Sequence, residues 1–200
     1  MGSLPYWNHN AAYYAWVRSE VATCSSILDV GCGNGALARY LSTGGNRIVG
    51  IDPAQGCIER ARALSSGDVR VVFECVPFSS YQAPPESFDA ILFVASLHHM
   101  DAAEALGKAK SLLASGGKIV IVGLASPSSL LDWAVEALRA IPCRISSAIH
   151  RENSSEKLEI PTSYKFPAMS DVRALAGRML PGARLRHGLH YRYLLTWTKR

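Results

Sequence analysis

The residues of this chain that are best suited to chemistry are acids and imidazoles near the ends of short apolar runs. Asp29 lies near the end of one run, Asp52 directly follows a second, and the pair His98 and His99 comes shortly after a third. A carboxylate accepts several hydrogen bonds, and an imidazole can act as a general base near neutral pH. Because ligands bind at the carboxyl ends of strands in open parallel sheets, the pattern predicts a ligand site there.

A glycine-rich turn follows the first of these runs. Gly31, Gly33 and Gly35 stand at alternate positions, and residues 36–41 then run at helical spacing. A strand, a glycine turn and a helix in this order allow the backbone to approach a ligand at the helix N-terminus. A Cβ atom at these positions would obstruct the tight turn or the ligand. The segment therefore predicts a site for a nucleotide-containing cofactor.

The elements that must position these residues alternate between extended and helical patterns. We expect strands at 27–30, 47–51, 69–73, 88–94, 118–123, 184–189 and 191–198. We expect helices at 10–23, 36–42, 54–64, 102–113, 130–140 and 171–180, with an irregular stretch at 144–169. Alternation of this kind is typical of a mostly parallel sheet covered on both faces.

The predicted fold is α/β: a Rossmann-like three-layer α/β/α sandwich whose seven-stranded, mostly parallel sheet ends in an antiparallel strand. The 200 residues are the size of one domain. We expect residues 1–24 to form an N-terminal helical cap and residues 25–125 the cofactor-binding core. Residues 126–180 would supply helices and an irregular lid, and residues 181–200 the last two strands.

Five segments together resemble the class I S-adenosylmethionine-dependent methyltransferases, in particular those that act on small molecules. The turn fills every fixed position of the D-x-G-x-G-x-G motif of that family. The other four segments follow it in the family's order and spacing: Ile48–Pro53, Ser87–Leu92, Leu97–Met100 and Leu112–Val120. The resemblance spans about residues 25–125, and the combination is more specific than any single motif.

A dinucleotide-dependent dehydrogenase is the competing interpretation of the same turn. Gly31, Gly33 and Ala36 also fit G-x-G-x-x-[GA], and Asp52 lies where a ribose-binding carboxylate belongs. The Y-x-x-x-K pair of short-chain dehydrogenases is absent, however, since Tyr164 is followed four residues later by Ala168. A carboxylate at Asp29 would repel a pyrophosphate but suits a cationic cofactor. S-adenosyl-L-methionine is therefore the expected cofactor.

The resemblance implies roles for individual residues. The methionyl end of the cofactor would lie against Asp29, Gly31, Cys32 and Gly33. Asp52, followed by Pro53, would bind the ribose hydroxyls, Phe78 would cover the adenine, and Val94 would contribute its backbone. Pro77 stands where many relatives carry an acid that binds the adenine amino group, so we expect a weaker affinity for the cofactor. No metal is expected.

His98 and His99 are the candidate catalytic residues, as a general base or as groups that orient the acceptor. Only one of the two is expected to face the cleft, and the alternative is that the pair anchors a loop or supports the cofactor. Aromatic residues before the first strand and the stretch 144–169, with Tyr164 and Phe166, are candidates for acceptor recognition. They suggest a small, partly aromatic acceptor with an oxygen or nitrogen nucleophile.

Composition limits the remaining possibilities. The chain is 48% hydrophobic and 18% charged, with a formal net charge of +5. It shows no apolar run long enough to span a membrane and no signal peptide, so we expect a cytoplasmic protein. Five cysteines without a C-x-x-C pair are expected to be reduced. Nucleic acid is an unlikely partner despite the basic charge; RNA or protein methylation and a non-catalytic, cofactor-binding subunit remain alternatives.

Overall fold

The computed structural model describes residues 10–65, 67–126, 166–188 and 191–200. In these ranges the chain forms a seven-stranded sheet in the order β3-β2-β1-β4-β5-β7-β6. Strands β3, β2, β1, β4 and β5 pair in parallel, whereas β7 is antiparallel to both of its neighbours, β5 and β6. The predicted sheet, mostly parallel and ending in an antiparallel strand, is thereby confirmed.

The strands are β1 (Ser26–Val30), β2 (Arg47–Asp52), β3 (Val71–Cys75), β4 (Phe88–Val94), β5 (Leu113–Leu124), β6 (Arg184–His187) and β7 (Arg192–Thr198). The helices are η1 (Ala11–Tyr13), α1 (Tyr14–Glu20), α2 (Ala36–Ser42), α3 (Gln55–Leu64), η2 (Leu97–His99), α4 (Ala102–Leu112) and α6 (Met169–Met179). Helix α2 and strand β4 have the predicted bounds. The helix predicted at 130–140 lies outside the described residues.

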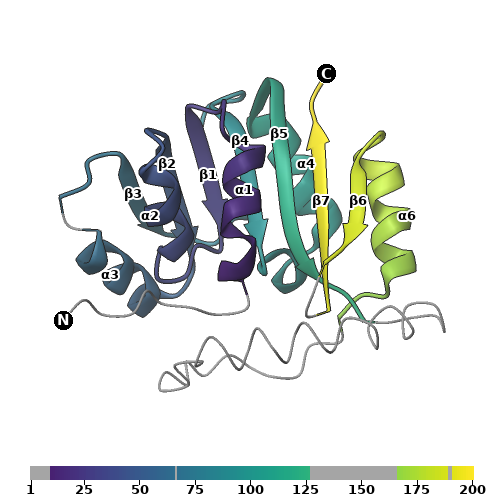
Figure 1. The fold of residues 1–200 in the computed structure, drawn as a ribbon, viewed down its shortest axis with the longest axis horizontal. Helices are drawn as coiled ribbons and strands as arrows, with labels where there is room; N and C mark the ends of the chain where they lie inside the picture. Colours follow the sequence, from purple (N-terminus) through teal and green to yellow (C-terminus); the bar gives the residue numbers. More distant parts are fainter. Residues whose placement is uncertain (1–9, 66, 127–165, 189–190) are drawn as a thin grey trace.

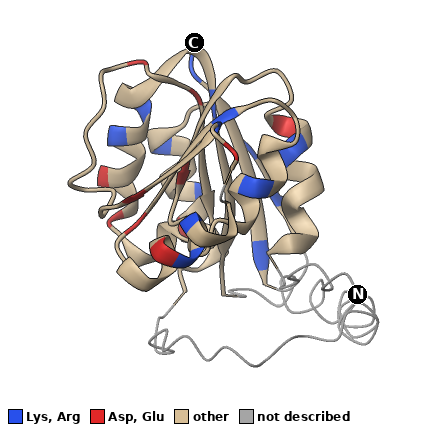
Figure 2. Ribbon diagram, turned by 90° about the vertical axis from the view of Figure 1, so that its left-hand side faces the viewer, with Lys and Arg blue, Asp and Glu red and all other residues tan. Residues whose placement is uncertain are grey.

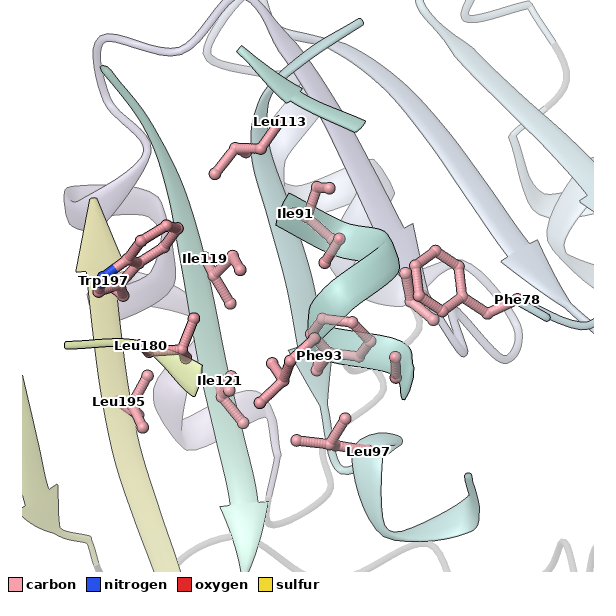
Figure 3. Packing of buried hydrophobic residues seen from close by; sticks show 14 of the residues in the cluster. Phe78, Ile91, Phe93, Leu97, Leu113, Ile119, Ile121, Leu180, Leu195 and Trp197 are labelled. Carbon is pink, nitrogen blue, oxygen red and sulfur yellow. The ribbon is translucent and has the colours of Figure 1, made fainter. Parts of the chain in front are cut away.

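Two hydrophobic layers hold the helices to the sheet. Helices α1, α2 and α3 cover one face, and α4 and α6 cover the other (Figure 1). Successive residues of the central strands serve opposite layers: Ile91 and Phe93 pack in the layer of α4 and α6 (Figure 3), whereas Ala90 and Leu92 pack in the other. This period of two, together with apolar side chains on both faces, is what a buried parallel strand requires. The expected three-layer sandwich is confirmed.

Strand β3 begins two residues later than predicted. Asp68 forms a turn in which its Oδ1 atom accepts hydrogen bonds from the backbone N–H of Arg70 (3.1 Å) and from Arg70 Nε (3.0 Å). The turn leaves Val69 94% exposed and outside the sheet. The strand therefore starts at Val71, although Val69 has a high intrinsic preference for extended structure.

Strand β5 begins earlier than the glycines of its motif suggested. Helix α4 ends at Leu112, and Leu113 already pairs with Phe88, before a shift in register that restores pairing at Lys118. The intervening residues are held to the end of β7: Gly116 N–H donates to Lys199 O (3.0 Å) and Lys199 N–H donates to Gly117 O (2.9 Å). These long-range bonds tie the segment to the end of β7, while Gly116 keeps the positive φ (+76°) of the turn that the local sequence indicates.

A tight contact joins β5 to the antiparallel strand β7. Gly123 is paired with Tyr193, and the Tyr193 ring lies over the glycine: a Cβ atom on Gly123 would stand 2.2 Å from Tyr193 Cζ. Tyr193 is buried in the core. An aromatic ring that covers a glycine of the neighbouring strand fills the space that the missing side chain leaves.

Candidate functional site

The residues singled out by the sequence gather at one edge of the sheet. Asp29 and the glycine turn lie at the end of β1, Asp52 ends β2, Val94 ends β4, and the two histidines form η2 directly beyond β4. In Figure 1 these strands point toward the same lower edge. Because the strands are parallel neighbours, four separate stretches of sequence meet at one place.

Backbone hydrogen bonds fix the glycine turn against β2. The N–H groups of Gly31 and Cys32 both donate to Ile51 O, at 2.8 and 3.0 Å. Gly33 N–H then donates to Asp52 Oδ2 at 3.0 Å. The turn of β1 and the end of β2 therefore form one unit, in which the motif backbone orients the carboxylate of Asp52.

The three glycines of the motif share a backbone conformation but differ in what surrounds them. All have positive φ: +72° at Gly31, +54° at Gly33 and +73° at Gly35. A Cβ atom on Gly31 would stand 2.5 Å from Ser96 Cβ, and one on Gly35 would stand 2.4 Å from Cζ of Phe73. A Cβ atom on Gly33 would meet nothing within 4 Å. Gly31 and Gly35 thus make room for the protein itself, whereas the space at Gly33 is available to a ligand.

Asp29 is a buried acid without a complete set of partners. The residue is 2% exposed, and no described residue makes a hydrogen bond to its Oδ2 atom. Burial, and to a smaller extent the negative charge of Asp52, raise the pKa of the Asp29 carboxyl to about 7. A buried carboxylate oxygen in this condition needs a cationic or hydrogen-donating ligand. The amino group of an amino-acid-bearing cofactor fits that need.

Asp52 is held with both oxygens directed to backbone donors. In addition to the bond from Gly33, Asp52 Oδ1 accepts a hydrogen bond from Ala54 N–H at 2.9 Å. Its carboxylate is half-buried, and the following Pro53 is exposed. A fixed carboxylate with free lone pairs can accept two further hydrogen bonds from a vicinal diol such as a ribose. The geometry is compatible with the predicted role.

Cys32 and Phe78 direct their side chains into the core. Burial raises the pKa of the Cys32 thiol, and the charges of Asp29 and Asp52 add to this, so the thiol stays protonated. The Phe78 ring is 5% exposed and packs edge-on against Phe93, with centroids 5.7 Å apart (Figure 3). Little of the Phe78 ring is therefore left to cover an adenine.

The residues that follow Val94 include two that sequence reasoning missed. Ala95 adopts a φ of +55°, which is rare for a residue with a Cβ atom, and its N–H donates to Val122 O at 2.7 Å. Ser96 is buried, and its hydroxyl oxygen has no hydrogen-bond partner among the described residues. Neither residue type carries a sequence signal for strain or for ligand binding, although both directly follow a predicted strand end.

The two histidines differ in their surroundings. His98 is half-buried and His99 is exposed, and their rings lie 4.0 Å apart between centroids. The pKa of His98 is lowered to about 4, mainly by burial and to a smaller extent by the positive charges of the neighbouring His99 and Arg192. His98 is therefore neutral at physiological pH, which is the form that accepts a hydrogen bond or a proton.

Segments from distant parts of the sequence also reach this edge of the sheet. The ring of Phe166, which precedes α6, meets the His98 ring edge-on at 5.4 Å between centroids. Arg192, at the start of β7, donates hydrogen bonds from Nε (3.1 Å) and Nη2 (2.7 Å) to Asn10 Oδ1. Because β7 is antiparallel, its first residue reaches the same edge of the sheet as the ends of β1 and β4. Tyr164 lies outside the described residues.

Comparisons with known proteins agree with this geometry. A family model described as a methyltransferase domain matches residues 28–121. An uncharacterized methyltransferase of Mycobacterium tuberculosis is 27% identical over 203 residues, which cover 96% of both chains. A ubiquinone biosynthesis O-methyltransferase of Bordetella parapertussis is 30% identical over 143 residues, which cover 66% of this chain and 59% of that protein.

Solved structures share the fold at low sequence identity. A protein of Pyrococcus horikoshii matches with a TM-score of 0.71 at 16% identity, covering 98% of this chain and 96% of that one. The 1,6-didemethyltoxoflavin-N1-methyltransferase of Burkholderia thailandensis, solved with S-adenosylhomocysteine, matches with a TM-score of 0.65 at 18% identity. That match covers 95% of this chain and 77% of the other.

Proposed function

Because this chain belongs to the class I S-adenosylmethionine-dependent methyltransferases, we propose that it transfers a methyl group to an oxygen or nitrogen atom of a small molecule by in-line displacement. Several of its relatives have names of this kind, among them the O-methyltransferase of Bordetella and a 27-O-demethylrifamycin SV methyltransferase of Amycolatopsis mediterranei, 37% identical over 100 residues. The latter match covers 48% of this chain and 37% of that protein.

The observation that carries the proposal is the unsatisfied carboxylate of Asp29 beside the open glycine. Asp29 Oδ2 would accept a hydrogen bond from the ammonium group of the cofactor. The open space at Gly33 would admit the amino-acid end of the cofactor. Asp52, already oriented by Gly33 and Ala54, would bind the ribose. Pro53, Val94 and the backbone of Cys32 and Phe78 would complete the site.

S-adenosylmethionine supplies an electrophilic methyl group, so the protein has to orient the acceptor and exclude water. Orientation alone lowers such barriers by about 7–11 kcal/mol in favourable cases. An acceptor hydroxyl must also lose its proton, and we assign that task to His98, whose imidazole is neutral at physiological pH. His99, exposed beside it, would orient the acceptor or support the loop.

The acceptor would bind against the wall formed by His98, Phe166, Arg192 and Asn10. An aromatic ring, an imidazole and a guanidinium offer stacking and hydrogen bonds at once. This combination supports a small acceptor that carries both an aromatic part and a polar or anionic oxygen. The position of the wall, next to the proposed cofactor site, rests on Ala95 and Ser96, which connect β4 to η2.

RNA or protein methylation is the second candidate, favoured by the net charge of +5. Figure 2 shows basic and acidic residues interspersed on the side of the molecule that it displays, which gives this alternative no additional support there. Among the described residues, no helix combines the length and the apolar character that a membrane span requires. A cytoplasmic location and a single-domain organisation remain part of the proposal.

Calorimetric titration with S-adenosylmethionine, S-adenosylhomocysteine and, as a control, NADH tests the cofactor site. We expect micromolar binding of both sulfur ligands and none of NADH. Asp52→Ala should weaken binding about 100-fold or more, because charge-assisted hydrogen bonds are lost. Asp171→Ala, which removes an exposed acid from α6, is the matched control and should bind normally.

Failure of the native protein to bind either sulfur ligand would refute the cofactor assignment. Binding without product formation across a broad panel of small acceptors would favour a non-catalytic, cofactor-binding subunit. Salt-sensitive retention on RNA, together with methylation of RNA, would favour the second candidate.

A further inference from the structure

Ser96 is the buried polar residue at the site that the roles assigned so far leave unused. The residue is 5% exposed, and no described residue makes a hydrogen bond to its hydroxyl oxygen. Buried hydroxyl groups in folded proteins are nearly always hydrogen-bonded, to the protein or to a ligand. A serine whose hydroxyl served only the fold would have its partner within the fold. The missing partner of Ser96 therefore points to a ligand.

The position of Ser96 places this hydroxyl next to the glycine turn. A Cβ atom on Gly31 would stand 2.5 Å from Ser96 Cβ and 3.3 Å from Ser96 Oγ, so the serine side chain lies directly against that glycine. Asp29 lies next to the last residue of β1, and Gly31 begins the turn that directly follows this strand. The two buried oxygens without described partners, Asp29 Oδ2 and Ser96 Oγ, thus flank one turn.

The backbone holds Ser96 in this place at some cost. The preceding residue, Ala95, has a φ of +55° and is fixed by the hydrogen bond from its N–H to Val122 O. On the other side, Ser96 O accepts a hydrogen bond from His99 N–H at 3.0 Å. Strained residues persist where the surrounding structure fixes them, and they cluster at functional sites. The side chain of Ser96 is thereby fixed beside Gly31, between the turn and the histidines.

We propose that Ser96 is a cofactor-binding residue whose hydroxyl oxygen accepts a hydrogen bond from the ammonium group that Asp29 neutralises. This inference rests on the proposed function, since it assigns a second ligand to the amino-acid end of the same cofactor. An ammonium group has three N–H donors and no acceptor, so a single carboxylate oxygen leaves it incompletely bound. Ser96 supplies a neutral acceptor that adds no further negative charge beside Asp29 and Asp52.

The test measures the affinities of two ligands for the native protein and for the variant Ser96→Ala. S-adenosylhomocysteine carries the amino-acid group, whereas 5′-methylthioadenosine keeps the nucleoside and the thioether but lacks it. We expect Ser96→Ala to lower the affinity for S-adenosylhomocysteine about tenfold, because a hydrogen bond to a charged group is lost. The affinity for 5′-methylthioadenosine should stay unchanged. The melting temperature of the ligand-free variant should equal or exceed that of the native protein, because a buried hydroxyl without a partner is removed.

The control is Ser111→Ala, which removes a hydroxyl on α4 that bonds to Lys108 O outside the site. It should change neither affinity. Equal weakening of both ligands by Ser96→Ala, or unchanged affinity for S-adenosylhomocysteine, would overturn the assignment while leaving the proposed function in place. A lower melting temperature with parallel loss of both ligands would indicate a structural role and overturn it as well. Failure of the native protein to bind S-adenosylhomocysteine would overturn the proposed function and this inference together.

Discussion

The two halves of the proposed site are built in different ways. The cofactor half is local: Asp29 to Gly33 and Asp52 to Ala54 lie on adjacent strands and bind one another through backbone hydrogen bonds. The acceptor half combines Asn10, His98, Phe166 and Arg192, which come from four segments that are far apart in the sequence. In the proposed function, the first half binds the cofactor and the second half binds the acceptor.

This difference predicts different responses to substitution. Changes in the cofactor half should affect folding and cofactor affinity together, because the same backbone bonds serve both. Changes in the acceptor half should affect turnover while leaving the cofactor bound. The predictions below test that separation, beginning with the largest expected effect.

Gly31→Ala should cause the largest loss. The new Cβ atom would stand 2.5 Å from Ser96 Cβ at a φ of +72°, so we expect a destabilisation of about 3 kcal/mol and no measurable binding of S-adenosylhomocysteine. Gly33→Ala is the matched comparison. It should cost about 1 kcal/mol in stability, because nothing lies within 4 Å, and should still abolish binding through collision with the ligand. Urea denaturation and calorimetry provide the two measurements, and equal destabilisation by both variants would contradict the assignment.

His98→Gln should lower kcat about 100-fold or more for a hydroxyl acceptor, with unchanged affinity for S-adenosylhomocysteine. His99→Gln, at the exposed neighbour, should have a much smaller effect. Since the pKa of His98 is lowered to about 4, kcat/KM for the acceptor at saturating cofactor should stay level down to about pH 5 and fall only below it. An acid limb near the ordinary pKa of 6.5 would contradict the lowered pKa of His98, and an unchanged kcat in the variant would show that His98 is not the base.

Asp29 should make cofactor binding depend on pH to a smaller extent. With a pKa raised to about 7, the carboxyl is protonated in the ligand-free protein below that pH and must ionise to bind an ammonium group. The affinity for S-adenosylhomocysteine should therefore rise about tenfold between pH 6 and pH 8, with release of up to one proton at pH 6. Calorimetry in buffers of different ionisation enthalpy measures that release, and a Kd independent of pH would rule out the linkage.

The same shift fixes the sign of the effect on stability. A raised pKa means that the folded state binds the proton more tightly than the unfolded state. The contribution of the protonated Asp29 to the free energy of unfolding is therefore complete below pH 3.8 and is lost as the pH rises through 7. His98 acts in the opposite direction: its lowered pKa removes stability as the pH falls from 6.5 to 4. Asp29→Asn should therefore stabilise the ligand-free protein at pH 8 and lower its affinity for the cofactor.

The contrast between the halves also explains what the sequence could predict. The order of elements and the cofactor motif follow from local patterns, because strand, glycine turn and acid are adjacent in the chain. The sequence could not reveal that Ser96 lies against Gly31 or that Arg192 binds Asn10, since both contacts depend on how distant parts of the chain come together. The predicted start of β5 was wrong for the same reason: the glycines before Lys118 are hydrogen-bonded to Lys199, which lies 82 residues after Gly117.

The pairing of Gly123 with Tyr193 has a consequence for how such a chain can change over generations. The tyrosine ring occupies the volume that any side chain at position 123 would need, so neither residue can be exchanged alone without leaving a clash or a void. Positions 123 and 193 should therefore vary jointly among homologues, with a larger residue at one accompanied by a smaller residue at the other. Such co-variation would record in an alignment the contact that joins the last strand to the rest of the sheet.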